Sequence, residues 1–155
     1  MRFNRQSIRK KGYDYSLSGY YFITICIYRN ESLLGEVINQ EMVLSSAGEM
    51  IEKWFNELEN KYNFIQCDEI IIMPNHIHFI LKIKTQVQFK TIGDIMKWFK
   101  TMTTNEYIRK VKHENWPPFS GKLWHRNYYE CIIRNEIELK NTRKYIQSNP
   151  KNWKT

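Results

Sequence analysis

The stretch Met73-Pro74-Asn75-His76-Ile77-His78-Phe79-Ile80-Leu81 decides the expected fold, because it joins a turn to the start of an apolar run. Pro74-Asn75 favours a turn, since proline presets a backbone angle and asparagine can bond its own backbone. The preceding segment Phe64–Met73 contains three consecutive isoleucines and has the composition of a buried strand. We therefore expect a central β-hairpin whose second strand, His76–Ile83, begins with two histidines.

The two histidines stand two residues apart, which places them on one face of an extended strand. Successive strand side chains alternate between faces, so His76 and His78 point one way, whereas Ile77 and Phe79 point the other. Neutral imidazole is a common metal ligand, and a strand fixes the distance between two rings. A His-x-His pair also occurs as an ordinary hydrogen-bonded strand pair, so the pair alone leaves both interpretations open.

The elements around this hairpin follow from residue type and apolar spacing. Aromatic and β-branched residues indicate a central strand near the N-terminus, and apolar residues at helical spacing indicate three helices. Pro150 disfavours helical geometry at Asn149, so the last helix should end there. The expected elements outside the hairpin are a strand over Gly19–Tyr28, a short hairpin of Leu33–Ile38 and Met42–Leu44, a helix of about fifteen residues capped by Ser45 or Ser46, a helix over Thr91–Lys112, a partly strand-like segment over Leu123–Arg134 and a helix over Asn135–Ser148.

Length and charge narrow the class of protein. The chain has 155 residues, 42% of them hydrophobic, which suits one compact domain over residues 1–155. A formal charge of +8 favours a polyanionic partner, because Lys and Arg release counterions from phosphates. Aromatic residues make up 15% of the chain and offer flat rings to unstacked bases. A merely solvated basic surface is the alternative interpretation.

Cysteine spacing and hydropathy exclude several other classes. Cys26, Cys67 and Cys131 lie far apart without C-x-x-C spacing, so the sequence indicates neither a disulfide framework nor a thiolate zinc site. No stretch approaches the length of a membrane span, and no apolar signal core follows the basic N-terminus. We therefore expect a cytoplasmic protein with no membrane partner.

Basic residues are concentrated in two places. Residues 1–12 form an expected basic arm without any acid, and the helix over Thr91–Lys112 carries further cations, among them Lys97 and Lys100. Each segment either contacts phosphates or is only solvated. The preceding helix is acidic, so it should lie away from any nucleic-acid surface. The cations of the arm are Arg2, Arg5, Arg9, Lys10 and Lys11.

The last helix carries a second candidate group. Tyr145 and Asn149 are four residues apart, so they are neighbours on one helix face, on the flank of the expected packing stripe. Arg143 and Lys144 precede the tyrosine. An amphipathic tyrosine at the edge of a core, followed by an asparagine cap, is the structural interpretation. A tyrosine that attacks a phosphate near a metal is the functional one.

Three motifs together resemble a known family. They are Met73-Pro74-Asn75-His76-Ile77-His78, Trp124-His125-Arg126-Asn127-Tyr128-Tyr129-Glu130 with Ile132-Ile133-Arg134, and Tyr145-Ile146 with Asn149-Pro150 and Trp153. In this order and with these separations, the chain resembles the REP-associated tyrosine transposases of the HUH single-tyrosine superfamily over nearly its whole length. The resemblance implies an α+β, ferredoxin-like fold: an antiparallel sheet with helices packed mainly on one face.

The resemblance also implies roles for individual residues. His76 and His78 match the metal ligands, Asn149 matches the third, polar ligand, and Tyr145 matches the nucleophile that forms a 5′-phosphotyrosine on single-stranded DNA. Mg²⁺ or Mn²⁺ suits these ligands, and zinc is not excluded by ligand type. His125 and Cys131 depart from the family pattern, in which Gln and His are frequent, so no role carries over to them. The expected DNA contacts are Arg2, Arg5, Arg9, Lys10, Lys11, Lys97, Lys100, Arg126, Arg143 and Lys144.

The sequence thus predicts a metal-dependent, single-tyrosine endonuclease and strand transferase that acts on single-stranded DNA near a hairpin. Two alternatives remain open: a non-catalytic hairpin-binding module derived from a transposase, and a phosphodiesterase that uses water. Tyr128 and Tyr129 are rival nucleophiles, although paired strand aromatics are usually packing residues. Whether the protein is a monomer or a homodimer stays open.

Overall fold

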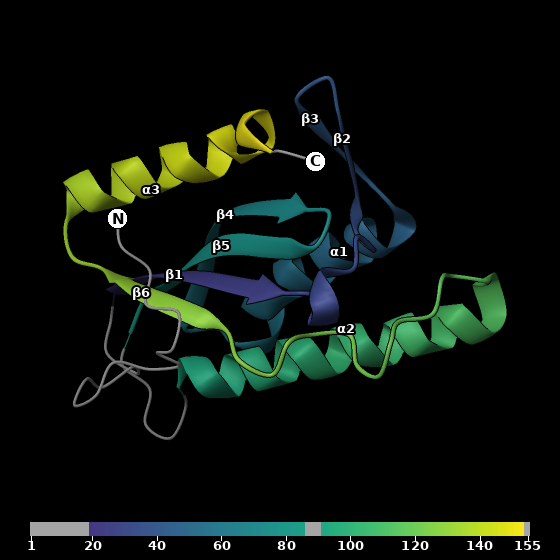
Figure 1. The fold of residues 1–155 in the computed structure, drawn as a ribbon. Coiled ribbons are helices and arrows are strands. Elements are labelled where there is room, and N and C mark those ends of the chain that lie inside the picture. The colour runs from purple at the N-terminus through teal and green to yellow at the C-terminus, as the bar shows by residue number, and fades with distance from the viewer. Residues whose placement is uncertain (1–18, 86–90, 154–155) are drawn as a thin grey trace.

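The computed structural model describes residues 19–85 and 91–153. Its centre is a four-stranded antiparallel sheet in the order β4-β5-β1-β6 (Figure 1). The strands are β1 (Gly19–Cys26), β4 (Ile65–Met73), β5 (His76–Ile83) and β6 (Tyr129–Ile133). The expected hairpin of β4 and β5 is therefore present, and the expected N-terminal strand lies in the middle of the sheet.

Two helices cover one face of this sheet and a third covers the other (Figure 1). The helices α1 (Ser46–Lys61) and α2 (Ile92–Glu114) pack on the face that carries the larger core, whereas α3 (Glu136–Ser148) packs on the opposite face. The succession β1-α1-β4-β5-α2-β6 is the ferredoxin-like arrangement. The α+β class with helices mainly on one face is thus confirmed, and α3 is the exception.

Strand alternation divides the apolar residues between two cores. Tyr21, Ile23 and Ile25 of β1 point into the larger core under α1 and α2. Phe22 of β1 and Ile80 of β5 point the other way and form a smaller core with residues of α3. The period of two along a strand requires this division. The sheet therefore has a packed core on each face, and the core on the α3 side is the smaller one.

Caps and turns define the ends of the elements. Ser45 Oγ accepts a hydrogen bond from Gly48 N at the start of α1, and Thr91 and Asp94 form a capping box on α2. Asn135 Oδ1 accepts from Glu138 N at the start of α3 and caps this helix. α3 ends at Ser148, as expected, but Asn149 keeps helical angles (φ −56°, ψ −46°) and begins the short helix η2 (Asn149–Asn152). The expectation that Pro150 would prevent helical geometry at Asn149 is therefore wrong, because proline is accepted in the first turn of the new helix.

The first expected strand is shorter than predicted, and the segment expected to be partly strand-like is a strand only in part. β1 ends at Cys26 because the chain enters the short helix η1 (Tyr28–Asn30), where Arg29 and Asn30 have φ of 60° and 56°. Positive φ values break the extended conformation. The segment Leu123–Arg134 is a regular strand only within β6, although Trp124 forms an isolated bridge with Ile27.

The expected short hairpin is also present, as β2 (Gly35–Ile38) and β3 (Glu41–Leu44), inserted between β1 and α1. The three cysteines are free and half-buried. None of the helices within the described ranges is both long and apolar enough to cross a membrane. The expected basic arm over residues 1–12 lies outside the described residues.

Candidate active site

Both histidines of β5 lie on the α3 side of the sheet. In the strand register His78 is opposite Thr24 and His76 is opposite Cys26, so their side chains share a face with Phe22 and not with the larger core. The two imidazole centroids are 4.7 Å apart. The expected convergence of two rings from one strand is therefore present.

Each imidazole uses its Nδ1 atom in a hydrogen bond. His78 Nδ1 lies 2.7 Å from Thr24 Oγ1, and His76 Nδ1 lies 2.7 Å from Asn75 Oδ1. Burial lowers the pKa of His76 to about 4, and burial together with the neighbouring His76 lowers the pKa of His78 to about 3. Both rings are consequently neutral at pH 7, which is the state in which imidazole binds a metal.

Tyr145 reaches the same place from α3. Leu139, Thr142 and Ile146 are the buried residues of this helix and dock it on the sheet. The ring of Tyr145 lies 5.5 Å from the ring of His78 and 6.1 Å from Phe22, centroid to centroid, and the residue is 39% exposed. The tyrosine is therefore close to the imidazole pair and still accessible to a large substrate.

The segment that follows α3 brings an aromatic ring close to His76. Asn149 Nδ2 donates a hydrogen bond to Tyr145 O over 3.3 Å. This bond uses the nitrogen of the side-chain amide and does not involve its oxygen. The ring of Trp153 lies 6.0 Å from the ring of His76. Histidines from β5 and residues from the end of α3 thus belong to one aromatic cluster, which contains His76, His78, Tyr145, Phe22 and Trp153.

The donor set can be compared with the needs of a divalent cation. Within residues 19–85 and 91–153, no three or more His, Cys, Asp or Glu side chains are grouped so that they could hold a metal. Among the described residues, a third ligand beside His76 and His78 would be a neutral oxygen, and the side-chain amide of Asn149, one turn after Tyr145, is of that type. Two neutral imidazoles and one amide fit a cation that keeps open positions for phosphate oxygens.

Two of the side chains expected to contact DNA already donate hydrogen bonds to acceptors of the protein itself. Arg143 forms a fork with Asp68, with Nε–Oδ1 at 2.9 Å and Nη2–Oδ2 at 2.6 Å, and this pairing raises the pKa of the guanidinium. Lys100 Nζ donates to the carbonyls of His125 and Arg126, each over 3.0 Å. Burial, assisted by nearby Lys122, lowers the pKa of Lys100 to about 8. Arg143 thus ties α3 to β4, and Lys100 holds the loop before β6.

The other expected contacts are exposed or lie outside the described residues. Lys97, Arg126 and Lys144 are exposed, so each can reach a phosphate without giving up a protein partner. The cations of the arm, Arg2, Arg5, Arg9, Lys10 and Lys11, belong to the segment that the structure does not describe. Their role stays a prediction.

The rival tyrosines differ in position. Tyr128 is 7% exposed and has the amine of Lys100 5.6 Å from its ring centroid. Tyr129 is paired with Thr24 in the register of β1 and β6, so it lies on the same face as His78 but two strands away from it. Between them, only Tyr129 shares the histidine face.

Sequence reasoning missed the partners of the histidines and one cation pair. Thr24 is an ordinary strand residue until β1 and β5 are aligned, and no signal in the local sequence identifies it as a partner of His78. Arg29 and Lys122 lie 5.4 and 4.8 Å from the ring centroid of Tyr28, the first residue of η1. Segments 27–28 and 122–123 are distant in sequence, so no local pattern brings these cations together.

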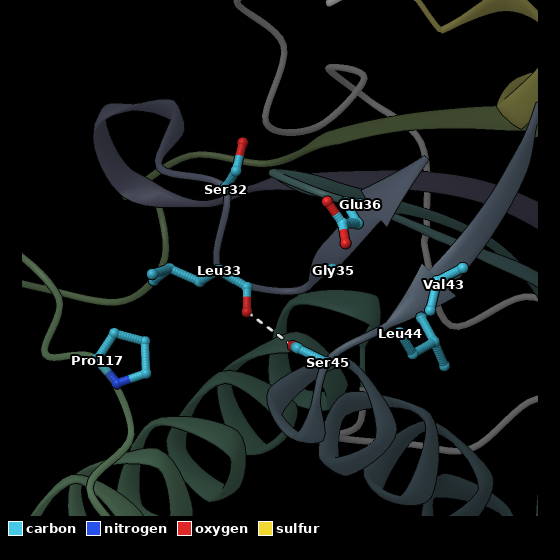
Figure 2. A pocket seen from close by; sticks show the side chains of 8 residues that line it. All are labelled: Ser32, Leu33, Gly35, Glu36, Val43, Leu44, Ser45 and Pro117. Atoms are coloured by element: carbon cyan, nitrogen blue, oxygen red, sulfur yellow. Dashed lines mark hydrogen bonds between the residues drawn. The ribbon is translucent and has the colours of Figure 1, made fainter. Parts of the chain in front are cut away.

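A hollow of about 340 Å³ lies elsewhere, between the β2–β3 hairpin and the loop at Pro117 (Figure 2). Figure 2 shows the carboxylate of Glu36 and the bond from Ser45 Oγ to Leu33 O in its lining. Neither histidine nor Tyr145 contributes to it. An anionic phosphate would be repelled by Glu36, so we do not assign the DNA to this hollow.

Comparison with known proteins gives the family. Residues 14–149 match the family described as Transposase IS200 like. An uncharacterised protein of Haemophilus influenzae is 37% identical over 169 residues, covering 97% of this chain and 90% of the relative. A second protein of that organism, provisionally named a REP-associated tyrosine transposase, is 25% identical and covers 88% of this chain and 73% of its own length.

Two solved structures share the fold. One is a REP-associated tyrosine transposase bound to a REP hairpin, with a TM-score of 0.58 and 16% identity over 92% of this chain and 72% of that one. The other is a crystal structure from Deinococcus radiodurans, provisionally named a transposase, with a TM-score of 0.51 and 18% identity over 90% of this chain and 95% of that one. At these identities the likeness concerns the fold.

Proposed function

Because the chain belongs to the family of IS200-like transposases, we propose that it cuts and rejoins single-stranded DNA beside a hairpin, with Tyr145 as the nucleophile. The observation that carries the proposal is the 5.5 Å separation between the rings of Tyr145 and His78, which come from different elements. A nucleophile and a pair of metal-binding imidazoles are thereby available to one phosphate. The REP hairpin bound by the structural relative suggests the type of DNA.

The reaction is a transesterification. The Tyr145 oxygen attacks the phosphorus, a phosphorus–tyrosine bond forms, and the bond to the 3′ oxygen breaks, which gives a 5′-phosphotyrosine and a free 3′-hydroxyl. The phenol loses its proton and the departing 3′ oxygen gains one. Because the phosphodiester energy is kept in the covalent intermediate, a 3′-hydroxyl can later attack it and rejoin DNA. This suits strand transfer better than hydrolysis.

Different residues of the site would bind the metal, position the tyrosine and contact the DNA. His76 and His78, with the Asn149 amide, would hold Mg²⁺ or Mn²⁺, which when bound supplies positive charge beside the scissile phosphate. A phenol with an ordinary pKa near 10 is a weak nucleophile and requires such charge. Docking of α3 on the small core positions the tyrosine. Lys97, Arg126 and Lys144 would contact the DNA backbone, which orients the strand but does not read its sequence.

The decisive test is Tyr145→Phe on a labelled single-stranded hairpin oligonucleotide. Wild-type protein with Mn²⁺ should give a denaturant-resistant protein–DNA band, which a chelator abolishes. Tyr145→Phe should bind the DNA with affinity close to that of the wild type but form no band, because the ring is kept and only the hydroxyl is lost. Tyr129→Phe is the matched control and should keep the band, as should Tyr128→Phe.

Other outcomes separate the alternatives. Metal-dependent cutting without any covalent band in the wild type would indicate the phosphodiesterase that uses water. Binding without cutting or band on hairpin DNA would indicate the non-catalytic module. A band that persists in Tyr145→Phe would contradict the assignment of the nucleophile and direct attention to Tyr129.

A further inference from the structure

We infer that Thr24 and Asn75 are positioning residues, which hold the protons of His78 and His76 on Nδ1 and so present both Nε2 lone pairs to the metal. The inference rests on the proposed metal site, and it adds two residues, Thr24 and Asn75, that would hold the two histidine ligands in place. Neither residue is expected to touch the metal or the DNA. Their role would be to select one of the two tautomers of each ring before the metal binds.

The argument is most direct for His76. In a neutral imidazole one nitrogen donates and the other accepts. Asn75 Oδ1 can only accept, and it lies 2.7 Å from His76 Nδ1. The proton of His76 therefore sits on Nδ1, and the Nε2 lone pair is left for a ligand. Asn75 is held in turn by the sheet, because its carbonyl accepts from Ile27 N over 2.8 Å.

For His78 the partner is a hydroxyl, which can donate or accept. Thr24 Oγ1 lies 2.7 Å from His78 Nδ1 in a buried setting, and Thr24 is 8% exposed. Register makes the contact possible, since Thr24 and His78 are directly opposite in the β1–β5 pair. If the hydroxyl accepts, Nε2 of His78 is a lone-pair donor like that of His76, and the two nitrogens serve one ion. If the hydroxyl donates, Nε2 carries a proton and cannot bind a metal.

Packing alone does not explain the threonine. Thr24 lies on β1 between Phe22 and Cys26 on the same face, where valine would have the same shape. Burying a hydroxyl is unfavourable unless it is hydrogen-bonded. The hydrogen bond to His78 compensates for that cost. In metal sites generally, the hydrogen bond made by the ring nitrogen that does not bind the metal fixes the orientation and the tautomer of the histidine.

The first experiment measures the tautomers in metal-free wild-type protein by ¹⁵N NMR of the histidine ring nitrogens. We expect the proton on Nδ1 in both His76 and His78. A His78 ring that is protonated on Nε2 would overturn the inference without any variant. Thr24→Val should give a mixture of tautomers at His78, whereas Thr24→Ser, which keeps the hydroxyl, should restore the single form.

The second experiment measures Mn²⁺ affinity by electron paramagnetic resonance. Loss of such a supporting bond typically weakens metal binding about 10–100-fold, and we expect that loss for Thr24→Val and for Asn75→Ala. Asn75→Asp keeps an accepting oxygen and should bind Mn²⁺ at least as tightly as the wild type. Unchanged affinity in both Thr24→Val and Asn75→Ala, or no measurable Mn²⁺ binding by the wild type, would overturn the inference.

Thr142→Val is the matched control. Thr142 is a buried threonine on the same side of the sheet, but its hydroxyl donates to Glu138 O of its own helix over 2.7 Å. Its replacement should alter neither the tautomers nor the Mn²⁺ affinity. Neither experiment contains DNA, so a protein that passes both but forms no covalent adduct would refute the proposed transesterification and leave this inference standing.

Discussion

Gly48 in the first turn of α1 shows how one missing side chain sets the position of a helix. A Cβ at this residue would lie 2.3 Å from Leu34 O and 3.0 Å from a methyl carbon of Leu44. Leu34 O is itself fixed, because it accepts a hydrogen bond from Ser45 N over 3.0 Å. The absence of a side chain therefore allows α1 to approach the segment that leads into the β2–β3 hairpin.

Gly48→Ala should destabilise the protein although alanine favours helices. The gain in helix propensity is about 1 kcal/mol, whereas relieving the overlap with a backbone carbonyl requires a shift that typically costs about 1–3 kcal/mol. We expect a lower free energy of unfolding in urea denaturation. Ser46→Ala, at an exposed position two residues earlier, is the control and should change stability by less than about 0.5 kcal/mol. A more stable Gly48→Ala variant would contradict the close approach.

At the scale of elements, a charged side chain of α2 connects the two helices that cover the larger core. Glu106 Oε1 accepts from Lys53 Nζ over 2.5 Å and from Trp54 Nε1 over 2.9 Å, both on α1. Burial alone would raise the pKa of Glu106, but these hydrogen bonds, together with the positive charges of Lys53 and Lys110, outweigh it and lower the pKa. The ionised carboxylate thus stabilises the α1–α2 pair.

The lowered pKa predicts the pH dependence of stability. A carboxylate whose pKa is lower in the folded state stabilises fully above its unfolded pKa, and the contribution is lost as pH falls through the folded value. Glu106→Gln should therefore cost about 1–2 kcal/mol at pH 7, with a difference from the wild type that shrinks below about pH 4.5. Urea denaturation from pH 7 to pH 3 measures this. A difference that stayed constant over this range would contradict the assigned hydrogen bonds.

At the scale of the whole molecule, the charge of +8 predicts salt-dependent DNA binding, but the structure distinguishes among the cations. Lys97, Arg126 and Lys144 are exposed, whereas Lys100 and Arg143 already donate to protein acceptors. Replacing an exposed cation that contacts phosphate reduces the slope of log affinity against log salt by about 0.7 on single strands. Replacing an engaged cation removes a hydrogen bond within the protein.

We therefore expect the triple substitution of Lys97, Arg126 and Lys144 by glutamine to flatten the salt slope and leave the unfolding free energy nearly unchanged. Arg143→Gln should instead lower the unfolding free energy, because it leaves Asp68 without its fork. Lys61→Gln, on the acidic helix α1, is the control for nonspecific charge and should preserve the slope. Fluorescence anisotropy with a fixed oligonucleotide at several salt concentrations tests this. An unchanged slope in the triple variant would show that these cations are only solvated.

Local rules in the sequence determined much of the site. The alternation of strand side chains was enough to place His76 and His78 on one face, and the expected bounds of the last helix agree with α3 to within one residue, because periodicity depends on neighbours within a few residues. The expected effect of Pro150 was wrong, since Asn149 keeps helical angles and continues into η2. The motif order was also enough to predict the family. The roles of Tyr145 and Asn149 in catalysis stay predictions.

Only the tertiary structure decided which distant residues meet. Thr24 is 54 positions from His78 and becomes its partner through the register of β1 and β5. Arg143 lies 75 positions from Asp68, and nothing in the sequence distinguished it from the exposed Lys144. The face of the sheet on which α3 docks is set by Phe22, Ile80 and Ile133 acting together. Such contacts depend on strand order and packing of the whole chain, and no local sequence pattern contains that information.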